Sequence, residues 1–211
     1  TEDLVVEHRR VETAQFDVDR RVLTLPLWEA SDNIIDVLVA HEVGHALYTP
    51  NIDPDCKAPQ QFLNITEDVR VEKLMKRKYM GIAKSFYRGY KELNEMDFFE
   101  LQDLDTYNLA DKVNLHFKIG PFLRIKFTPQ EQEIVNDIEK IETFEDSIRV
   151  AETLYNFCRT EHQESSQGGQ EQEWVQQGTF DSSQESGDID TDSSDFDESP
   201  IPNFGGSSSM E

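Results

Sequence analysis

The segment 31–50, SDNIIDVLVAHEVGHALYTP, constrains the fold of this chain more than any other part of the sequence. Its apolar residues follow the period of an α-helix, and two histidines continue the same face. The residues on this face are Ile34, Leu38, His41 and His45, at spacings of four, three and four. Ser31 suits the N-cap of such a helix, and Pro50 ends it. We therefore predict a helix that carries an apolar stripe and two imidazoles on one face.

The residues from His41 to His45 form the pattern HExxH. Side chains four residues apart on a helix are neighbours, so the two imidazoles can bind one metal ion. Glu42 lies beside that position rather than on it, where its carboxylate can take a proton from a water activated by the metal. A structural pair of histidines also fits the bare pattern. We predict a Zn²⁺ site with His41 and His45 as ligands and Glu42 as the catalytic general base.

A catalytic zinc site needs a third protein ligand and leaves its fourth position to water. A second helix, predicted at about 64–79, offers three acidic candidates: Glu67, Asp68 and Glu72. Glu67 follows His45 by 22 residues, which allows a loop and a returning helix, and it is the preferred ligand; Asp68 is the next candidate. The alternative role for Glu67 is in a capping box begun by Asn64. Asp68 and Glu72 also suit the role of accepting the second N–H of a ligand histidine.

The remainder of the first 160 residues reads as a small sheet followed by helices. Alternation around Phe16 and the run VLTLPL at 22–27 predict strands before the HExxH helix, and the strand at 22–25 is a candidate to pair with an extended peptide. Further helices are expected at about 64–79, 84–95, 108–118, 128–141 and 144–160. Thr128, Pro129 and Glu131 supply an N-cap, an N1 proline and a capping-box acid. The fold class is therefore α+β, mostly helical.

Residues 161–211 differ sharply in composition from the rest of the chain. They contain 13 acidic residues and no Lys or Arg. A segment of this kind buries too little apolar surface to offset the entropy lost on ordering. We expect one domain over residues 1–160, followed by a disordered acidic linker or tail over 161–211. Such a tail is suited to engage a basic protein partner.

The whole chain of 211 residues has 20 Lys and Arg against 43 Asp and Glu, a formal net charge of −23. Direct nucleic-acid binding is not expected, because affinity for phosphates comes from Lys and Arg. No run of 18 apolar residues is present and the N-terminus lacks the pattern of a signal peptide, so we expect no membrane association and a cytoplasmic location. Cys56 and Cys158 show no CxxC spacing and are expected to be thiols.

A strand that ends in leucine and proline, then AHEVGHALYTP, then LNITEDVRVE, resembles a known family of domains. These are the gluzincin-like metallopeptidase domains of proteins that also carry a von Willebrand factor A domain, including the cobaltochelatase subunit, nitric oxide reductase activation proteins and peptidases of tailed bacteriophages. The resemblance covers about residues 15–80. It implies a zincin-like fold in which His41 and His45 bind zinc, Glu42 is catalytic and Glu67 is the third ligand. The family's usual second motif has Asn and Glu adjacent, whereas Glu67 stands three residues after Asn64, which leaves Asp68 and Glu72 as alternatives.

The resemblance also implies a setting for the domain. In this family the peptidase-like domain is followed by an acidic linker and a von Willebrand factor A domain, with an AAA+ ATPase as a further partner. On that basis we expect the chain to be the N-terminal part of a larger protein, in the host cytoplasm if it is phage-encoded. The leading hypothesis is a zinc metallopeptidase that cleaves a peptide or protein substrate. The alternative is a catalytically silent, zinc-stabilised adaptor or assembly module, for example in phage morphogenesis.

Overall fold

The computed structural model describes residues 4–11, 13–17, 19–27 and 29–165. The expected acidic tail therefore lies outside the described residues except for its first five positions, which continue the last helix. Within the described part, three short strands precede six α-helices, and the fold is α+β and mostly helical, as the sequence predicts. No helix in this part of the chain is long and apolar enough to cross a membrane.

The sheet contains β1 (Val5–Arg9), β2 (Gln15–Asp17) and β3 (Val22–Pro26), in the order β1-β3-β2. β3 pairs in parallel with β1 and antiparallel with β2. The expectation that β3 pairs with a peptide is wrong, because both of its edges are already hydrogen-bonded to neighbouring strands. β2 is instead the edge strand beside α1. β1 was not predicted, since most of its side chains are exposed and show no buried alternation.

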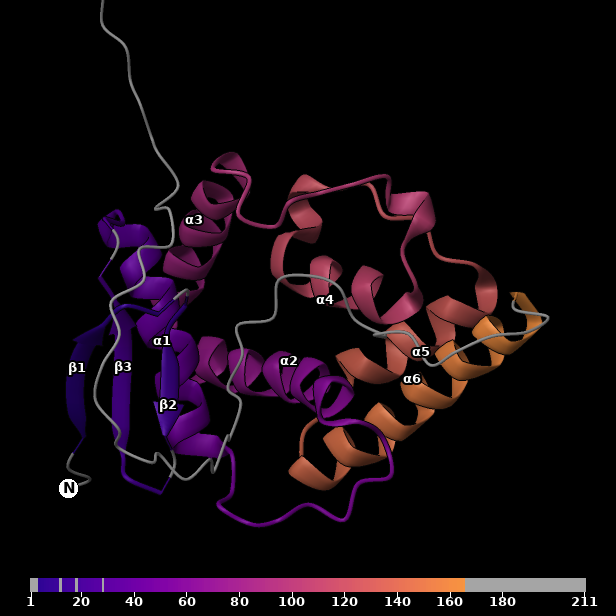
Figure 1. The fold of residues 1–211 in the computed structure, drawn as a ribbon, viewed down its shortest axis with the longest axis horizontal. Helices are drawn as coiled ribbons and strands as arrows, with labels where there is room; N and C mark the ends of the chain where they lie inside the picture. The colour runs from indigo at the N-terminus through magenta and orange to yellow at the C-terminus, as the bar shows by residue number, and fades with distance from the viewer. Residues whose placement is uncertain (1–3, 12, 18, 28, 166–211) are drawn as a thin grey trace, which may run out of the picture.

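The HExxH segment forms α1 (Asp32–Tyr48), with the Ser31 side chain accepting a hydrogen bond from the Ile34 N–H at 3.2 Å. The predicted N-cap and the predicted end before Pro50 are both confirmed. α1 packs on the sheet and against α3 (Ile82–Glu95). The sheet, α1 and α3 lie together at one end of the molecule (Figure 1). Leu23, Ile34, Leu38 and Phe86 belong to the hydrophobic core at this end.

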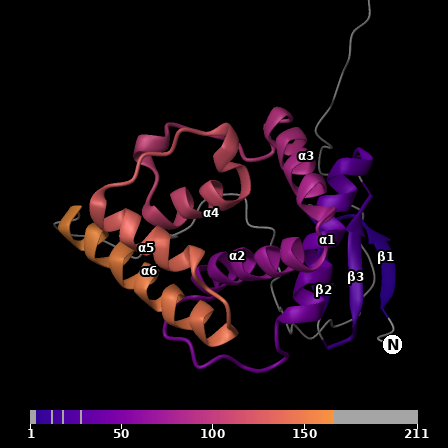
Figure 2. The same ribbon diagram turned by 180° about the vertical axis from the view of Figure 1, so that it is seen from behind.

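The second motif lies in α2 (Gln60–Lys78), which begins earlier than predicted. Pro59 precedes the helix and provides the extended residue at which it starts, so Asn64 is an interior residue whose side chain accepts from Gln60 at 2.9 Å. The capping box proposed for Asn64 and Glu67 is therefore absent. In both views α2 runs between the sheet end and the C-terminal helices (Figures 1 and 2).

The other end of the molecule is formed by α4 (Leu109–Ile119), α5 (Pro129–Glu139) and α6 (Phe144–Ser165). Two 3-10 turns, Leu104–Thr106 and Gly120–Phe122, flank α4. The capping box of Thr128 and Glu131 is confirmed in both directions. These helices and one face of α2 enclose a second hydrophobic core. α6 extends five residues beyond the predicted domain limit at 160.

Two glycines allow α1 to approach its neighbours closely. A Cβ on Gly44 would lie 3.1 Å from Met75 Cγ and 3.5 Å from Val71 Cβ, both on α2. A Cβ on Gly89 of α3 would lie 2.5 Å from the Asn33 carbonyl oxygen and 2.6 Å from Val37 Cγ1. The second contact involves backbone and cannot be relieved by a side-chain rotation, so α1 and α3 pack at a separation that only glycine permits.

We predict that Gly89→Ala lowers the free energy of unfolding by about 3 kcal/mol, because the added methyl overpacks the contact between α1 and α3. Urea denaturation of the full chain measures this value. Gly81→Ala is the matched control, since a Cβ there has no atom within 4 Å, and its effect should stay within about 1 kcal/mol. Equal effects of the two substitutions would contradict the packing argument.

Candidate metal centre

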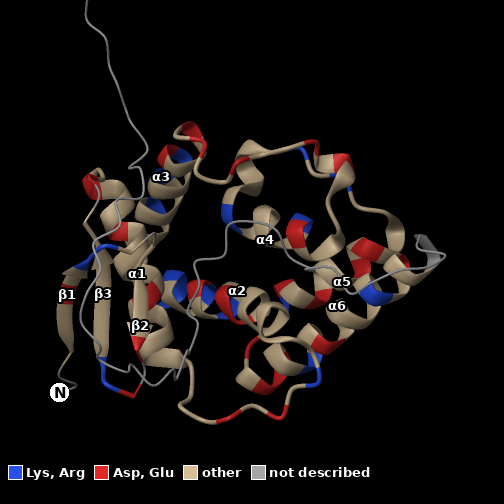
Figure 3. Ribbon diagram, viewed as in Figure 1, with Lys and Arg blue, Asp and Glu red and all other residues tan. Residues whose placement is uncertain are grey.

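A cluster of buried polar side chains lies where α1 meets α2, between the two hydrophobic cores. His41, His45 and Asp68 expose only 1%, 4% and 3% of their surfaces. Charged residues occur along α2, whereas β3, the central strand of the sheet, carries none (Figure 3). The close approach at Gly44 places the Asp68 carboxylate against the histidines of α1.

The three ligand-type atoms form a compact triangle. His41 Nε2 and His45 Nε2 are 3.3 Å apart, and Asp68 Oδ1 lies 3.2 Å from His45 Nε2 and 3.5 Å from His41 Nε2. Tetrahedral zinc with bonds of 2.0–2.1 Å places neighbouring ligand atoms about 3.3 Å apart. The triangle therefore fits three corners of a zinc tetrahedron, and this is the group in the described residues whose geometry suits a metal ion.

The other ring nitrogens of the two histidines are held by hydrogen-bonding groups. His41 Nδ1 lies 3.1 Å from Glu72 Oε1, which also accepts from the Tyr90 hydroxyl. His45 Nδ1 lies 3.0 Å from Thr49 Oγ1, whose hydroxyl donates to Glu67 Oε1 at 2.7 Å. Because the acceptors face Nδ1 in both rings, Nε2 is the nitrogen suited to bind a metal. The expectation that Glu72 orients a histidine matches this arrangement.

Glu67, the preferred third ligand in the sequence, does not join the triangle. It accepts from Arg70 Nε at 2.8 Å and from Ser147 Oγ at 2.9 Å, in addition to Thr49. Glu67, Arg70 and Ser147 expose 4% of their surface or less. A carboxylate occupied by these donors is not oriented for metal binding. The register of α2 brings Asp68 to the histidines instead, so the structure favours the second sequence candidate over the first.

Glu42, the acidic residue of the HExxH motif, makes no hydrogen bond within the described residues. Its side chain is fully buried, and neither carboxylate oxygen has a hydrogen-bond partner among the described residues. Burial raises the pKa of Glu42 to about 7, although the nearby charges of His41 and His45 oppose the shift. A carboxyl group with this pKa can both accept and return a proton near neutral pH.

A buried lysine adds a positive charge to the cluster. Lys118 of α4 is 5% exposed, and its Nζ lies 3.0 Å from Asp68 Oδ2. Burial alone would raise the pKa of Asp68, but Lys118 and His41 hold it well below the usual range. Burial would likewise lower the pKa of His41, but Asp68 and Glu72 raise it to about 10. Without a metal, His41 therefore carries a proton that a metal must displace.

Burial and nearby charges also act in opposite directions on Glu72, the acid that contacts His41 Nδ1. Burial would raise the pKa of Glu72, but Lys76 at 2.8 Å and His41 lower it to about 2. Burial and the charge of Glu72 together raise the pKa of Tyr90 well above its ordinary value. Tyr90 therefore stays protonated and continues to donate to Glu72, which in turn holds the His41 ring.

Lys118, Tyr90, Thr49 and Ser147 were not identified from the sequence. Lys118 alone left a signal, because it shares the buried face of α4 with Leu115 and Ile119. The sequence also offers Tyr48, Tyr79, Arg88 and His116 as residues that could stabilise an oxyanion. Tyr79 and Arg88 are exposed, and His116 packs edge-on against Phe117 and Phe127. Tyr48 is partly buried at the end of α1, where its backbone carbonyl accepts from Arg70 at 2.7 Å. Comparison of the chain with protein-family models, curated proteins and solved structures gave no match. Function is therefore argued from the geometry of this cluster.

We predict that Glu67→Ala lowers the free energy of unfolding by about 3–5 kcal/mol, because it leaves the buried Arg70 guanidinium without its counter-charge. Glu142→Ala is the matched control. Glu142 also pairs with an arginine, Arg77, but the two side chains are 46% and 56% exposed, so Glu142→Ala should lower the free energy of unfolding much less than Glu67→Ala does. Chemical denaturation of both variants measures the difference, and similar losses would contradict a structural role for Glu67.

Proposed function

We propose that this protein is a zinc-dependent peptidase, in which His41, His45 and Asp68 bind the metal and Glu42 is the general base. The observation that carries the proposal is the unpartnered carboxylate of Glu42. A buried carboxylate without hydrogen bonds is costly to the fold. Glu42 lies next to the three candidate ligand atoms, where a general base is needed for hydrolysis. A purely structural metal site needs no such carboxylate.

The donor set supports zinc among the common divalent ions. Two imidazole nitrogens and one carboxylate oxygen are the ligands of a hydrolytic zinc site, with one position left for water. Magnesium and calcium prefer oxygen ligands and six or more of them. The choice of Asp68 in place of Glu67 preserves this donor set, because one carboxylate replaces another.

Each residue of the cluster then has a defined task. His41, His45 and Asp68 would hold zinc, which would act as a Lewis acid on a peptide carbonyl and make a water more acidic. Glu42 would take the proton from the attacking water and pass it to the leaving amine, which is the task of a general base and then of a general acid. Glu72 and Thr49 hold the two rings so that Nε2 keeps its orientation. Lys118 holds Asp68 by its second oxygen.

A cavity beside His45 offers an extended peptide a way to approach the cluster. A small cavity of about 60 Å³ is lined by His45, Glu67, Ile52, Phe144 and Phe16 of the edge strand β2. The open side of β2 can pair with substrate backbone, as edge strands do in peptide recognition. The apolar side chains that line the cavity, Phe16, Ile52 and Phe144, suit a hydrophobic residue of the peptide.

The alternative proposal is a catalytically silent, zinc-stabilised adaptor or assembly module, as in phage morphogenesis or beside a von Willebrand factor A domain. The burial of all three ligand candidates and the ion pair between Lys118 and Asp68 favour it, since they describe a centre closed to solvent. In that case chelation unfolds the domain and no peptide is cleaved at any zinc concentration. Cleavage of any member of a peptide library would exclude the alternative.

We predict that the purified chain binds one Zn²⁺ and that Asp68→Asn weakens binding at least about 100-fold, whereas Glu67→Gln weakens it at most about tenfold. The reason is that Asp68 is a direct ligand and Glu67 acts only through Thr49. Competition with a chromophoric chelator measures both affinities, and circular dichroism checks that both variants are folded. The reverse order of the two affinities would restore Glu67 as the ligand.

We predict that Glu42→Gln keeps its zinc but lowers peptide cleavage about 10²–10⁴-fold, because the amide cannot accept the proton of the attacking water. Cleavage of a peptide library, followed by mass spectrometry, measures the loss beside the zinc content of the same sample. Wild-type rates in the zinc-loaded variant would refute Glu42 as the base.

A further inference from the structure

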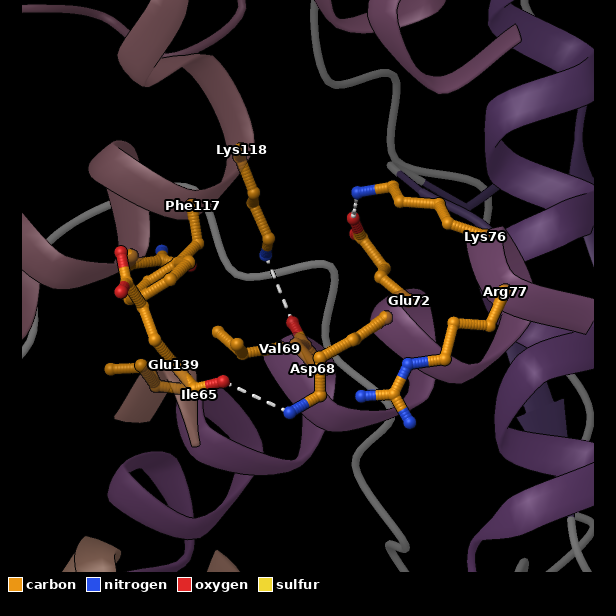
Figure 4. A pocket seen from close by; sticks show the side chains of 11 residues that line it. Ile65, Asp68, Val69, Glu72, Lys76, Arg77, Phe117, Lys118 and Glu139 are labelled. Carbon is orange, nitrogen blue, oxygen red and sulfur yellow. Dashed lines mark hydrogen bonds and ion pairs between the residues drawn. The ribbon is translucent and has the colours of Figure 1, made fainter. Parts of the chain in front are cut away.

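A larger cavity adjoins the cluster on the side of Asp68 that faces away from the histidines. It has a volume of about 390 Å³ and lies between α2 and α4. Asp68 is shared by the two places, since Oδ1 faces His45 Nε2 at 3.2 Å and Oδ2 faces Lys118 Nζ at 3.0 Å. Figure 4 shows Lys118 reaching from α4 toward Asp68 and Lys76 reaching toward Glu72 inside this cavity.

The lining of this cavity contains one more basic than acidic side chain. Four of the 20 Lys and Arg residues of the chain line it, against three acidic side chains: Lys73, Lys76, Arg77 and Lys118 against Asp68, Glu72 and Glu139. Two of the acids, Asp68 and Glu72, also accept from the buried histidines, so their charge is shared with the metal centre. Glu142 pairs with both Lys73 and Arg77 at the rim.

The cations near the opening retain hydrogen-bonding capacity. The Lys76 side chain is 34% exposed and its ammonium makes one bond to Glu72, whereas an ammonium has three donors. The Arg77 side chain is 56% exposed and uses two of its five donors on Glu142. Ile65, Val69 and Phe117 supply an apolar surface beside them. A carboxylate carried on a short aliphatic stem matches this combination of charge and apolar contact.

We propose that the cavity between α2 and α4 is a substrate subsite that binds a carboxylate group of a peptide. This inference rests on the proposed peptidase function and adds a substrate class to it. The carboxylate is either an acidic side chain or the C-terminal carboxylate, because both present the same two oxygens. In a chain with a net charge of −23, attraction for such a peptide must come from a local group of cations.

Isothermal titration of the full zinc-loaded chain carrying Glu42→Gln tests the proposal, because this variant is expected to leave the peptide uncut. Three probes are compared: acetyl-Ala-Gly-Ala-Glu-amide, acetyl-Ala-Gly-Ala-Gln with a free C-terminal carboxylate, and the neutral acetyl-Ala-Gly-Ala-Gln-amide. We expect at least one carboxylate probe to bind about tenfold more tightly than the neutral probe. The probe that gains affinity identifies the source of the carboxylate, and equal binding of all three overturns the proposal.

A matched pair of substitutions on α2 assigns the binding to the cavity. Arg77→Gln should weaken the carboxylate probe about three- to tenfold and leave the neutral probe unchanged, because Arg77 is exposed at the rim and makes only a surface ion pair. Lys78→Gln removes the same charge one residue further on, outside the cavity lining, and should change neither probe. Equal effects of the two variants would mean that affinity depends on the overall charge of the protein and not on this cavity, which would overturn the subsite.

The outcome is separable from that of the peptidase proposal because binding and cleavage are measured independently. If carboxylate probes bind through Arg77 but wild-type protein cleaves no peptide, the subsite stands and the peptidase function fails. If wild-type protein cleaves neutral and acidic peptides equally well and Arg77→Gln has no effect on binding, the peptidase function stands and the subsite fails.

Discussion

Two imidazoles and a carboxylate converge in a space from which water is almost excluded, and the surrounding structure is organised by the need to keep these groups satisfied. Ionisable groups in such a place are costly unless each has a partner. Glu72, Tyr90 and Lys76 stabilise the His41 side of the cluster, while Thr49, Glu67 and Arg70 stabilise the His45 side. Lys118 balances Asp68 from a third helix. The packing of α1, α2 and α4 is thus coupled to the charge state of one small centre.

Glu42 is the exception to this rule of satisfaction. Its neighbours on α1 and α2 form hydrogen bonds, yet its own oxygens have none within the described residues, and burial moves its pKa to about 7. Shifted pKa values of this kind concentrate at functional sites, because an acid or base works best when its pKa is close to the ambient pH. The local cost at Glu42 is compatible with a stable fold because two hydrophobic cores flank the centre.

The same centre has two different faces. Beside His45 a small cavity, lined by both apolar and polar side chains, adjoins the edge strand β2, and beyond Asp68 a larger cavity includes lysine and arginine in its lining. A peptide that spans both would place apolar and acidic groups on opposite sides of the ligand cluster. The arrangement arises because α2 separates the two cores and contributes Glu67 to one cavity and Asp68 to the other. Adjacent residues on one helix point in directions about 100° apart, so they serve different surroundings.

The sequence by itself determined the local features: the α1 helix with its Ser31 cap, the capping box at Thr128, the pairing of His41 with His45 on one face, and the candidate set for a third ligand. The helix, its cap, the capping box and the histidine pair each depend on residues within about four positions of one another, where helix geometry is fixed. Tertiary structure decided the rest. Asp68 rather than Glu67 meets the histidines, β3 is central rather than an edge, and Lys118 arrives from 50 residues further along the chain. These outcomes depend on where α2 starts and on how the helices and strands pack against one another. Such contacts join residues far apart in the chain, so the local sequence pattern does not determine them.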